Sequence, residues 1–100
     1  MRYIYNTTYL IDEKIETEWV EFVRANFIPF LEQQDPVKDI LFTKVSIDQP
    51  EGKTYSLQLF FDTEKELNDF SQQYVPILEE KMISAYKNRY LCFSSMLKEI

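Results

Sequence analysis

The feature that most constrains the fold is a repeated change in the spacing of hydrophobic residues. Four short segments alternate apolar and polar residues, as strands do, and two longer segments repeat apolar residues every three or four positions, as helices do. The order is strand, helix, strand, strand, helix, strand. The strands are predicted at residues 3–11, 38–47, 54–61 and 90–97, and the helices at about 13–33 and between 63 and 88.

Local signals mark where these elements start and stop. Asp12 offers an N-cap oxygen to the first helix, and Thr63 with Glu66 forms a capping box at the start of the second. Asn88 is a suitable left-handed stop after that helix. Residues 49–52, Gln-Pro-Glu-Gly, predict a type I turn that joins the second and third strands into a hairpin.

This order of elements predicts an α+β fold. With short connections and right-handed crossovers, the economical arrangement is a four-stranded antiparallel sheet with both helices on one face, the ferredoxin-like plait (βαββαβ). The chain has 100 residues, which suits a single domain over residues 1–100 with one hydrophobic core.

Composition excludes several classes of function. One glycine leaves no phosphate-binding loop, and the absence of histidine removes His-dependent triads and His-ligated metals. Cys92 is the only cysteine, so no internal disulfide forms, and no acidic spacing predicts a metal site. The net charge of −6 opposes nucleic-acid binding. We expect neither a cofactor nor a metal.

No apolar run approaches the ~20 residues that span a bilayer, and the N-terminal residues lack the apolar centre of a signal peptide. We therefore expect a cytoplasmic protein without a membrane partner.

Each predicted helix contains a proline in a similar setting, Phe-Ile-Pro-Phe-Leu around Pro29 and Tyr-Val-Pro-Ile-Leu around Pro76. Each proline removes a backbone hydrogen bond, to the carbonyls of Ala25 and Gln72, at a cost of about 3 kcal/mol. The simpler interpretation is a bend that wraps each helix over the sheet. The alternative is that both freed carbonyls face a pocket or an interface.

The sheet face opposite the helices is predicted to be mixed in character, because the more apolar alternating sets are assigned to the helix side. Such a face suits a homodimer packed sheet to sheet, with a partly polar chamber between the sheets. The interface candidates are Leu10, Phe42, Phe60 and Met96, and the ligand-binding candidates are Asn6, Thr8, Lys44, Gln58 and Ser94.

Each candidate also has a simpler interpretation. Lys44 suits a rim position, the polar side chains can bond one another or water, and Cys92 suits a small packing residue. No catalytic constellation is found among them.

The chain resembles a family of small bacterial proteins of unknown function, grouped with the dimeric α/β-barrel proteins. The resemblance covers nearly the whole length. It rests on residues 4–8, Trp19 with Ile28-Pro29, residues 54–58, residues 74–76 and residues 93–97. Members often carry a histidine where this chain has Phe27, so any chemistry of that histidine is lost here. Related barrel families include cofactor-free monooxygenases and small-molecule-binding domains.

Two functional hypotheses follow. The first is a cytoplasmic homodimeric binding or interaction module without its own catalysis, which takes a small-molecule ligand at the dimer interface if its chamber is open. The alternative is a small cofactor-independent monooxygenase-like enzyme, in which Asn6, Lys44 and Gln58 orient a substrate in that chamber. Fold analogy alone does not choose between them.

Overall fold

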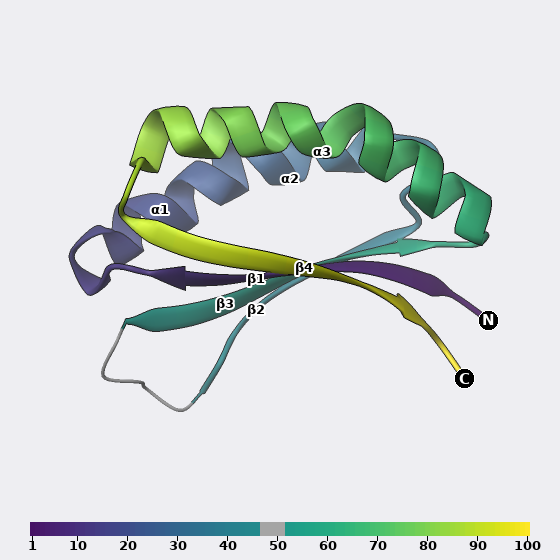
Figure 1. Cartoon of the computed structure of the whole chain (residues 1–100), viewed down its shortest axis with the longest axis horizontal. Helices are drawn as coiled ribbons and strands as arrows, with labels where there is room; N and C mark the ends of the chain where they lie inside the picture. Colours follow the sequence, from purple (N-terminus) through teal and green to yellow (C-terminus); the bar gives the residue numbers. More distant parts are fainter. Residues whose placement is uncertain (47–51) are drawn as a thin grey trace.

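A computed structural model of the chain describes residues 1–46 and 52–100. It shows one four-stranded antiparallel sheet with all helical segments on one face (Figure 1). The predicted fold class is confirmed. Most of the predicted turn at residues 49–52 lies outside the described residues.

The sheet has the strand order β2-β3-β1-β4, so the first strand of the chain lies in the interior. Its strands are β1 (Tyr3–Ile11), β2 (Asp39–Lys44), β3 (Lys53–Phe61) and β4 (Tyr90–Lys98). β1 pairs along its whole length with both β3 and β4, for example Asn6 with Gln58 and with Ser95. β4 and β2 are the two edges.

Gly52, just before β3, shows why a glycine is needed there. Its φ of +146° is a conformation that L side chains rarely adopt, and a Cβ atom would run into the backbone carbonyl oxygen of Ile11. The single glycine of the chain therefore lets the backbone of β3 approach that of β1.

The first helical layer is continuous but not uniform. It contains a 3-10 turn η1 (Glu13–Ile15), α1 (Glu16–Phe22), a π-helical turn η2 (Val23–Phe27) and α2 (Ile28–Glu32). Its buried residues are spaced four apart at 15, 19, 23, 27 and 31. Because four exceeds the 3.6 residues of an α-helical turn, a strict α-helix would rotate this stripe off the sheet. The wider π turn takes up the drift.

The second layer is α3 (Glu64–Tyr86), with Pro76 in its interior. The hydroxyl oxygen of Thr63 accepts a hydrogen bond from the Glu66 amide at 3.1 Å, as the capping box predicts, but the Glu66 carboxylate accepts from the Thr63 hydroxyl rather than from an amide. Asn88, with φ of 66°, provides the predicted left-handed stop. No helix in the described part of the chain is long and apolar enough to cross a membrane.

The core lies between the helices and the sheet, with Trp19 at its centre. The indole ring packs against Tyr55 at 5.1 Å and Tyr9 at 5.2 Å between ring centroids. Its Nε1–H donates to the Sδ atom of Met82 at 3.2 Å, which links α1 to α3. The lower face of the sheet has no helical cover (Figure 1).

Candidate functional site

The open face of the sheet is the face that no helix covers. Register places on it five of the candidates predicted from sequence: Asn6, Thr8, Leu10, Gln58 and Phe60. Phe60 is only 6 % exposed, because its own chain covers it. The Arg2 guanidinium lies 4.5 Å from the centroid of the Phe60 ring.

Two candidates on β2 lie on the opposite face, so their predicted placement was wrong. Phe42 packs on the helix side, 5.8 Å from Trp19 and stacked on Tyr55 at 5.7 Å. Lys44 also reaches the helix side, where its Nζ is 2.7 Å from Oε2 of Glu16. Both alternating sets of β2 contain apolar residues, and only packing against α1 and α2 decides which set is covered.

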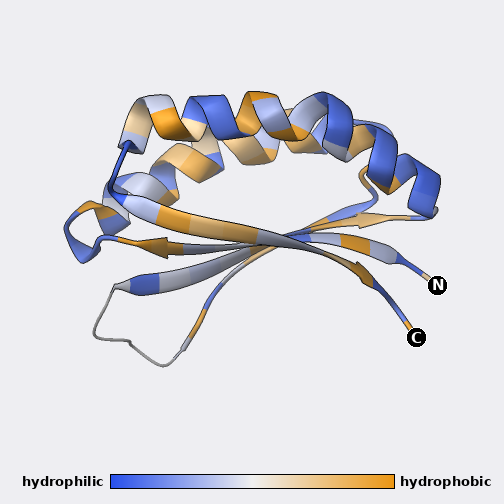
Figure 2. Cartoon of the chain, viewed as in Figure 1, coloured by the Kyte–Doolittle hydropathy of each residue, from blue (hydrophilic) through white to orange (hydrophobic). Residues whose placement is uncertain are grey.

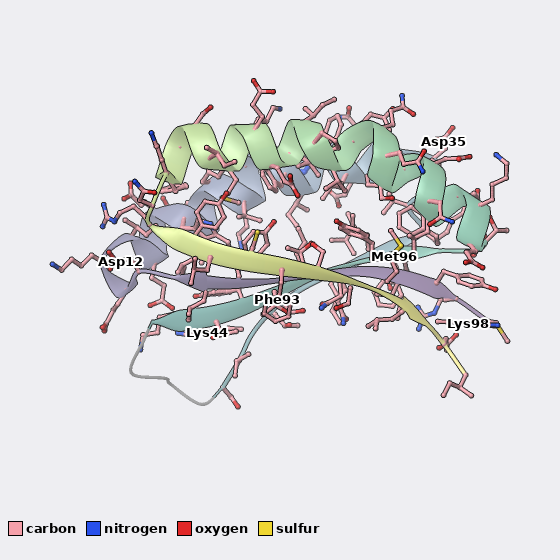
Figure 3. All side chains as sticks on the ribbon, viewed as in Figure 1. Asp12, Asp35, Lys44, Phe93, Met96 and Lys98 are labelled. Carbon is pink, nitrogen blue, oxygen red and sulfur yellow. The ribbon has the colours of Figure 1, made fainter. Side chains whose placement is uncertain are left out.

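The placement of the candidates on β4 was also wrong. Ser94 and Met96 face the helix side, where the Ser94 and Thr7 hydroxyl oxygens are 3.0 Å apart. The open face instead carries Leu91, Phe93, Ser95 and Leu97. Figure 3 shows Phe93 and Met96 on opposite sides of β4.

The polar side chains of the open face bond largely to one another. The Ser56 hydroxyl donates to Oδ1 of Asn6 at 2.7 Å, and Nδ2 of Asn6 donates to the Thr8 hydroxyl at 3.4 Å. These contacts favour the simpler interpretation given above, because satisfied groups lose less when they are covered.

On the helix side, Glu16 collects two partners. Its Oε2 atom accepts from the Tyr55 hydroxyl and from Lys44 Nζ, each at 2.7 Å. These contacts, with Lys44 the larger, lower the pKa of the Glu16 carboxyl. Burial and Glu16 together raise the pKa of Tyr55 to about 12. Glu16, Lys44 and Tyr55 thus form one polar network that links α1 to β2 and β3.

A cavity of about 30 Å³ lies between α3 and the sheet, and the sequence did not predict it. It draws on β1, β3, β4, η2 and α3, so no single segment signals it. Its lining has an apolar part, Phe27, Leu57, Leu59, Val75, Leu78 and Met82, and a part with polar groups, Tyr5, Thr7, Tyr9, Glu79, Tyr90, Cys92 and Ser94.

Both proline segments border this cavity. Phe27 is the last residue of the π turn, two residues before Pro29, and Val75 directly precedes Pro76. π-helical turns often occur at functional sites. The prediction that the freed carbonyls of Ala25 and Gln72 face a pocket is not supported here, because both residues are exposed and neither lines this cavity.

The titratable groups of the cavity are all acids. Burial is the main cause of the raised pKa of Tyr9, of Tyr90 and of the Cys92 thiol, and Glu79 raises all three further. The Tyr9 and Tyr90 hydroxyls and the Cys92 thiol therefore stay protonated at neutral pH. No lysine, arginine or histidine lines the cavity, and the described residues contain no cluster of three His, Cys, Asp or Glu that could hold a metal ion.

Sheet, helices and register together define a ferredoxin-like plait. Over residues 2–100 the sequence matches the family described as "Domain of unknown function (DUF4286)". The chain belongs to this family, as the resemblance implied. No curated protein matches it.

Solved structures with little sequence identity share the fold. A protein from Nitrosomonas europaea assigned to the antibiotic biosynthesis monooxygenases aligns with a TM-score of 0.73 at 8% identity, covering 99% of this chain and 90% of that one. A member of the ethyl tert-butyl ether degradation (EthD) family from Bacillus halodurans aligns at 0.70 and 11%, covering 98% and 99%. A conserved protein from Methanosarcina mazei aligns at 0.73 and 8%, covering 100% and 94%. At these identities the likeness shows the fold alone.

Proposed function

We propose that the chain is a binding module that forms a homodimer through the open face of its sheet. The observation that carries the proposal is the exposure of large apolar side chains on that face. Leu91 is 71 % and Phe93 66 % exposed, and Leu41 and Leu97 are also exposed. Hydrophobic residues run along β4, which lies at the edge of the sheet (Figure 2). A small monomer rarely leaves such a patch uncovered.

The charge distribution supports a second copy as the occupant. The chain carries a net charge of −6, so two copies repel each other over most of their surface. On the open face, the paired strand positions of the described residues include a single formal charge, Asp39 at the β2 edge, and the Arg2 guanidinium lies over Phe60. The face is therefore where two acidic copies approach with least repulsion.

The test is the oligomeric state measured by light scattering on a sizing column. We expect a mass of twice 12.1 kDa for the native chain and a monomer for Phe93→Asp, with the helical circular dichroism unchanged. Ile83→Asp is the matched control, because Ile83 is exposed on α3 rather than on the sheet. A native monomer, or a Phe93→Asp dimer, contradicts the proposal.

Phe60→Asp is a poorer probe of this interface. Phe60 is buried within its own chain under Arg2, so a carboxylate there destabilises the monomer as well. Loss of the dimer would then not be separable from loss of the fold.

The monooxygenase-like alternative loses the residue set that motivated it. Lys44 lies on the helix side and Asn6 and Gln58 on the open side, so the three do not meet in one chamber. The N. europaea structure supports the shared fold without carrying an activity to this chain. Because Cys92 has no disulfide partner, we also propose the cytoplasm as the compartment. Cell fractionation tests that assignment.

A further inference from the structure

Two tyrosine hydroxyls belong to residues that line the cavity between α3 and the sheet. Tyr9 is 8 % exposed and Tyr5 is 9 % exposed, yet neither hydroxyl has a hydrogen-bond partner within the described residues. No side-chain polar atom in that part of the chain is fully enclosed without a partner, so these hydroxyls keep some accessible surface for water or a ligand. A buried phenol normally finds such a partner.

The side chains that line the cavity favour a positively charged ligand. Four aromatic side chains, those of Tyr5, Tyr9, Phe27 and Tyr90, line the cavity, and the Tyr9 and Tyr90 ring centroids are 6.3 Å apart. The only formally charged lining group is the carboxylate of Glu79. Aromatic faces attract organic cations, and a carboxylate without a neighbouring cation attracts them further.

The size of the cavity sets what it can hold. Its volume of about 30 Å³ accommodates one or two water molecules or a group of similar size, and benzene needs a much larger space. Cys92 and Ser94, which also line it, are exposed on the edge strand β4. The rest of a ligand can therefore extend outward past β4, toward the open hollow that shares Tyr90 and Cys92 with the cavity.

We propose that this cavity binds the ammonium head group of a small organic amine, with the tyrosine rings around the cation and Glu79 as its counter-ion. The site lies on the opposite face from the proposed dimer interface. It does not depend on the dimer, and either proposal can fail alone.

The experiment compares three probes of equal chain length: butylammonium, butan-1-ol and butanoate, at matched ionic strength. Binding is measured by calorimetry and by the fluorescence of Trp19, the only tryptophan, whose ring lies 5.2 Å from that of Tyr9. We expect butylammonium to bind about tenfold more tightly than butan-1-ol, and butanoate to bind most weakly.

Neighbouring glutamates provide a matched pair of variants. Glu79→Gln should weaken butylammonium binding about fivefold and leave butan-1-ol unchanged. Glu80→Gln removes the same charge from the next residue, which lines a different groove with Phe22 and Asn26, and should leave both affinities unchanged. Both glutamates are exposed, so both variants should keep the native fold.

Three outcomes overturn the proposal. The first is butan-1-ol or butanoate binding as tightly as butylammonium, and the second is no binding of any probe at tens of millimolar, which leaves a cavity for water alone. The third is equal weakening by Glu79→Gln and Glu80→Gln, which means that the net charge of the chain, not this site, attracts the cation.

Discussion

Lys44 and Tyr55 show how side chains on two strands converge on one group from a helix. Both place a donor 2.7 Å from the same oxygen of Glu16, on the covered side of the sheet. The contact replaces the role predicted for Lys44, because a lysine committed to a carboxylate is not available to hold a ligand on the open face. Lys44 remains 45 % exposed in this pair, so the pair contributes little to stability.

Lys44→Met should raise the pKa of Glu16 toward its ordinary value of 4.5. The lowered pKa in the folded state gives stability that is present above pH 4.5 and lost as the pH falls through the folded value. The variant should therefore lose less stability on acidification and be less stable at neutral pH by under about 1 kcal/mol.

Carboxyl NMR titration and urea unfolding at several pH values measure both effects. Lys65→Met, which removes an exposed pair with Asp69 on α3, is the control and should leave the Glu16 titration unchanged. An unaltered Glu16 titration in Lys44→Met would contradict the assigned contact.

At the scale of elements, the two prolines share a sequence pattern but not a structural setting. Pro29 stands in the first turn of α2, directly after the π turn η2. The amide of Ile28, the residue before it, donates a hydrogen bond to the Val23 carbonyl. Pro76 stands inside α3, where its missing N–H removes a bond to Gln72. The first proline is therefore accommodated by its element and the second is not.

We expect Pro76→Ala to stabilise the fold by about 1–2 kcal/mol, since the restored hydrogen bond outweighs the greater freedom of the unfolded chain. Pro29→Ala should change stability by less than about 1 kcal/mol, because proline is well tolerated in a first turn. Urea unfolding compares the two variants. If Pro76→Ala destabilises instead, α3 needs its proline to pack on the sheet.

The elements could be predicted from sequence, while the faces of the two edge strands could not. Periodicity and caps such as Thr63 are local, so they fix where elements begin. β1 and β3 were placed correctly because their covered sets are clearly the more apolar ones. In β4 the more apolar set, with Leu91 and Phe93, is the exposed one, and only the pairing of β4 with β1 reveals it.

The cavity could not be predicted for a related reason. Tyr9, Phe27, Glu79 and Cys92 come from four segments far apart in the sequence, and each alone fits an ordinary core or surface residue. The prolines were no reliable signal, because the residues whose carbonyls they free, Ala25 and Gln72, are exposed and do not line the cavity.

At the scale of the whole molecule, an acidic surface surrounds an apolar open face. The charge of −6 keeps copies apart except where the open faces meet. Near pH 4.6, where the net charge vanishes, this protection is lost. We expect light scattering to show association beyond the dimer at that pH and none at neutral pH. Phe93→Asp should reduce this association. Equal association of the native chain and the variant would mean that the associating surface is not the open face.

The position of β1 inside the sheet also has a consequence for how the protein is made. β1 is synthesised before both of its partners: β3 begins about fifty residues later, and β4 only at Tyr90. Until residues 90–98 have been synthesised, one edge of β1 has no partner. Its unpaired backbone N–H and C=O groups can then form hydrogen bonds with a wrong strand. The sheet is therefore complete only after β4 has been synthesised.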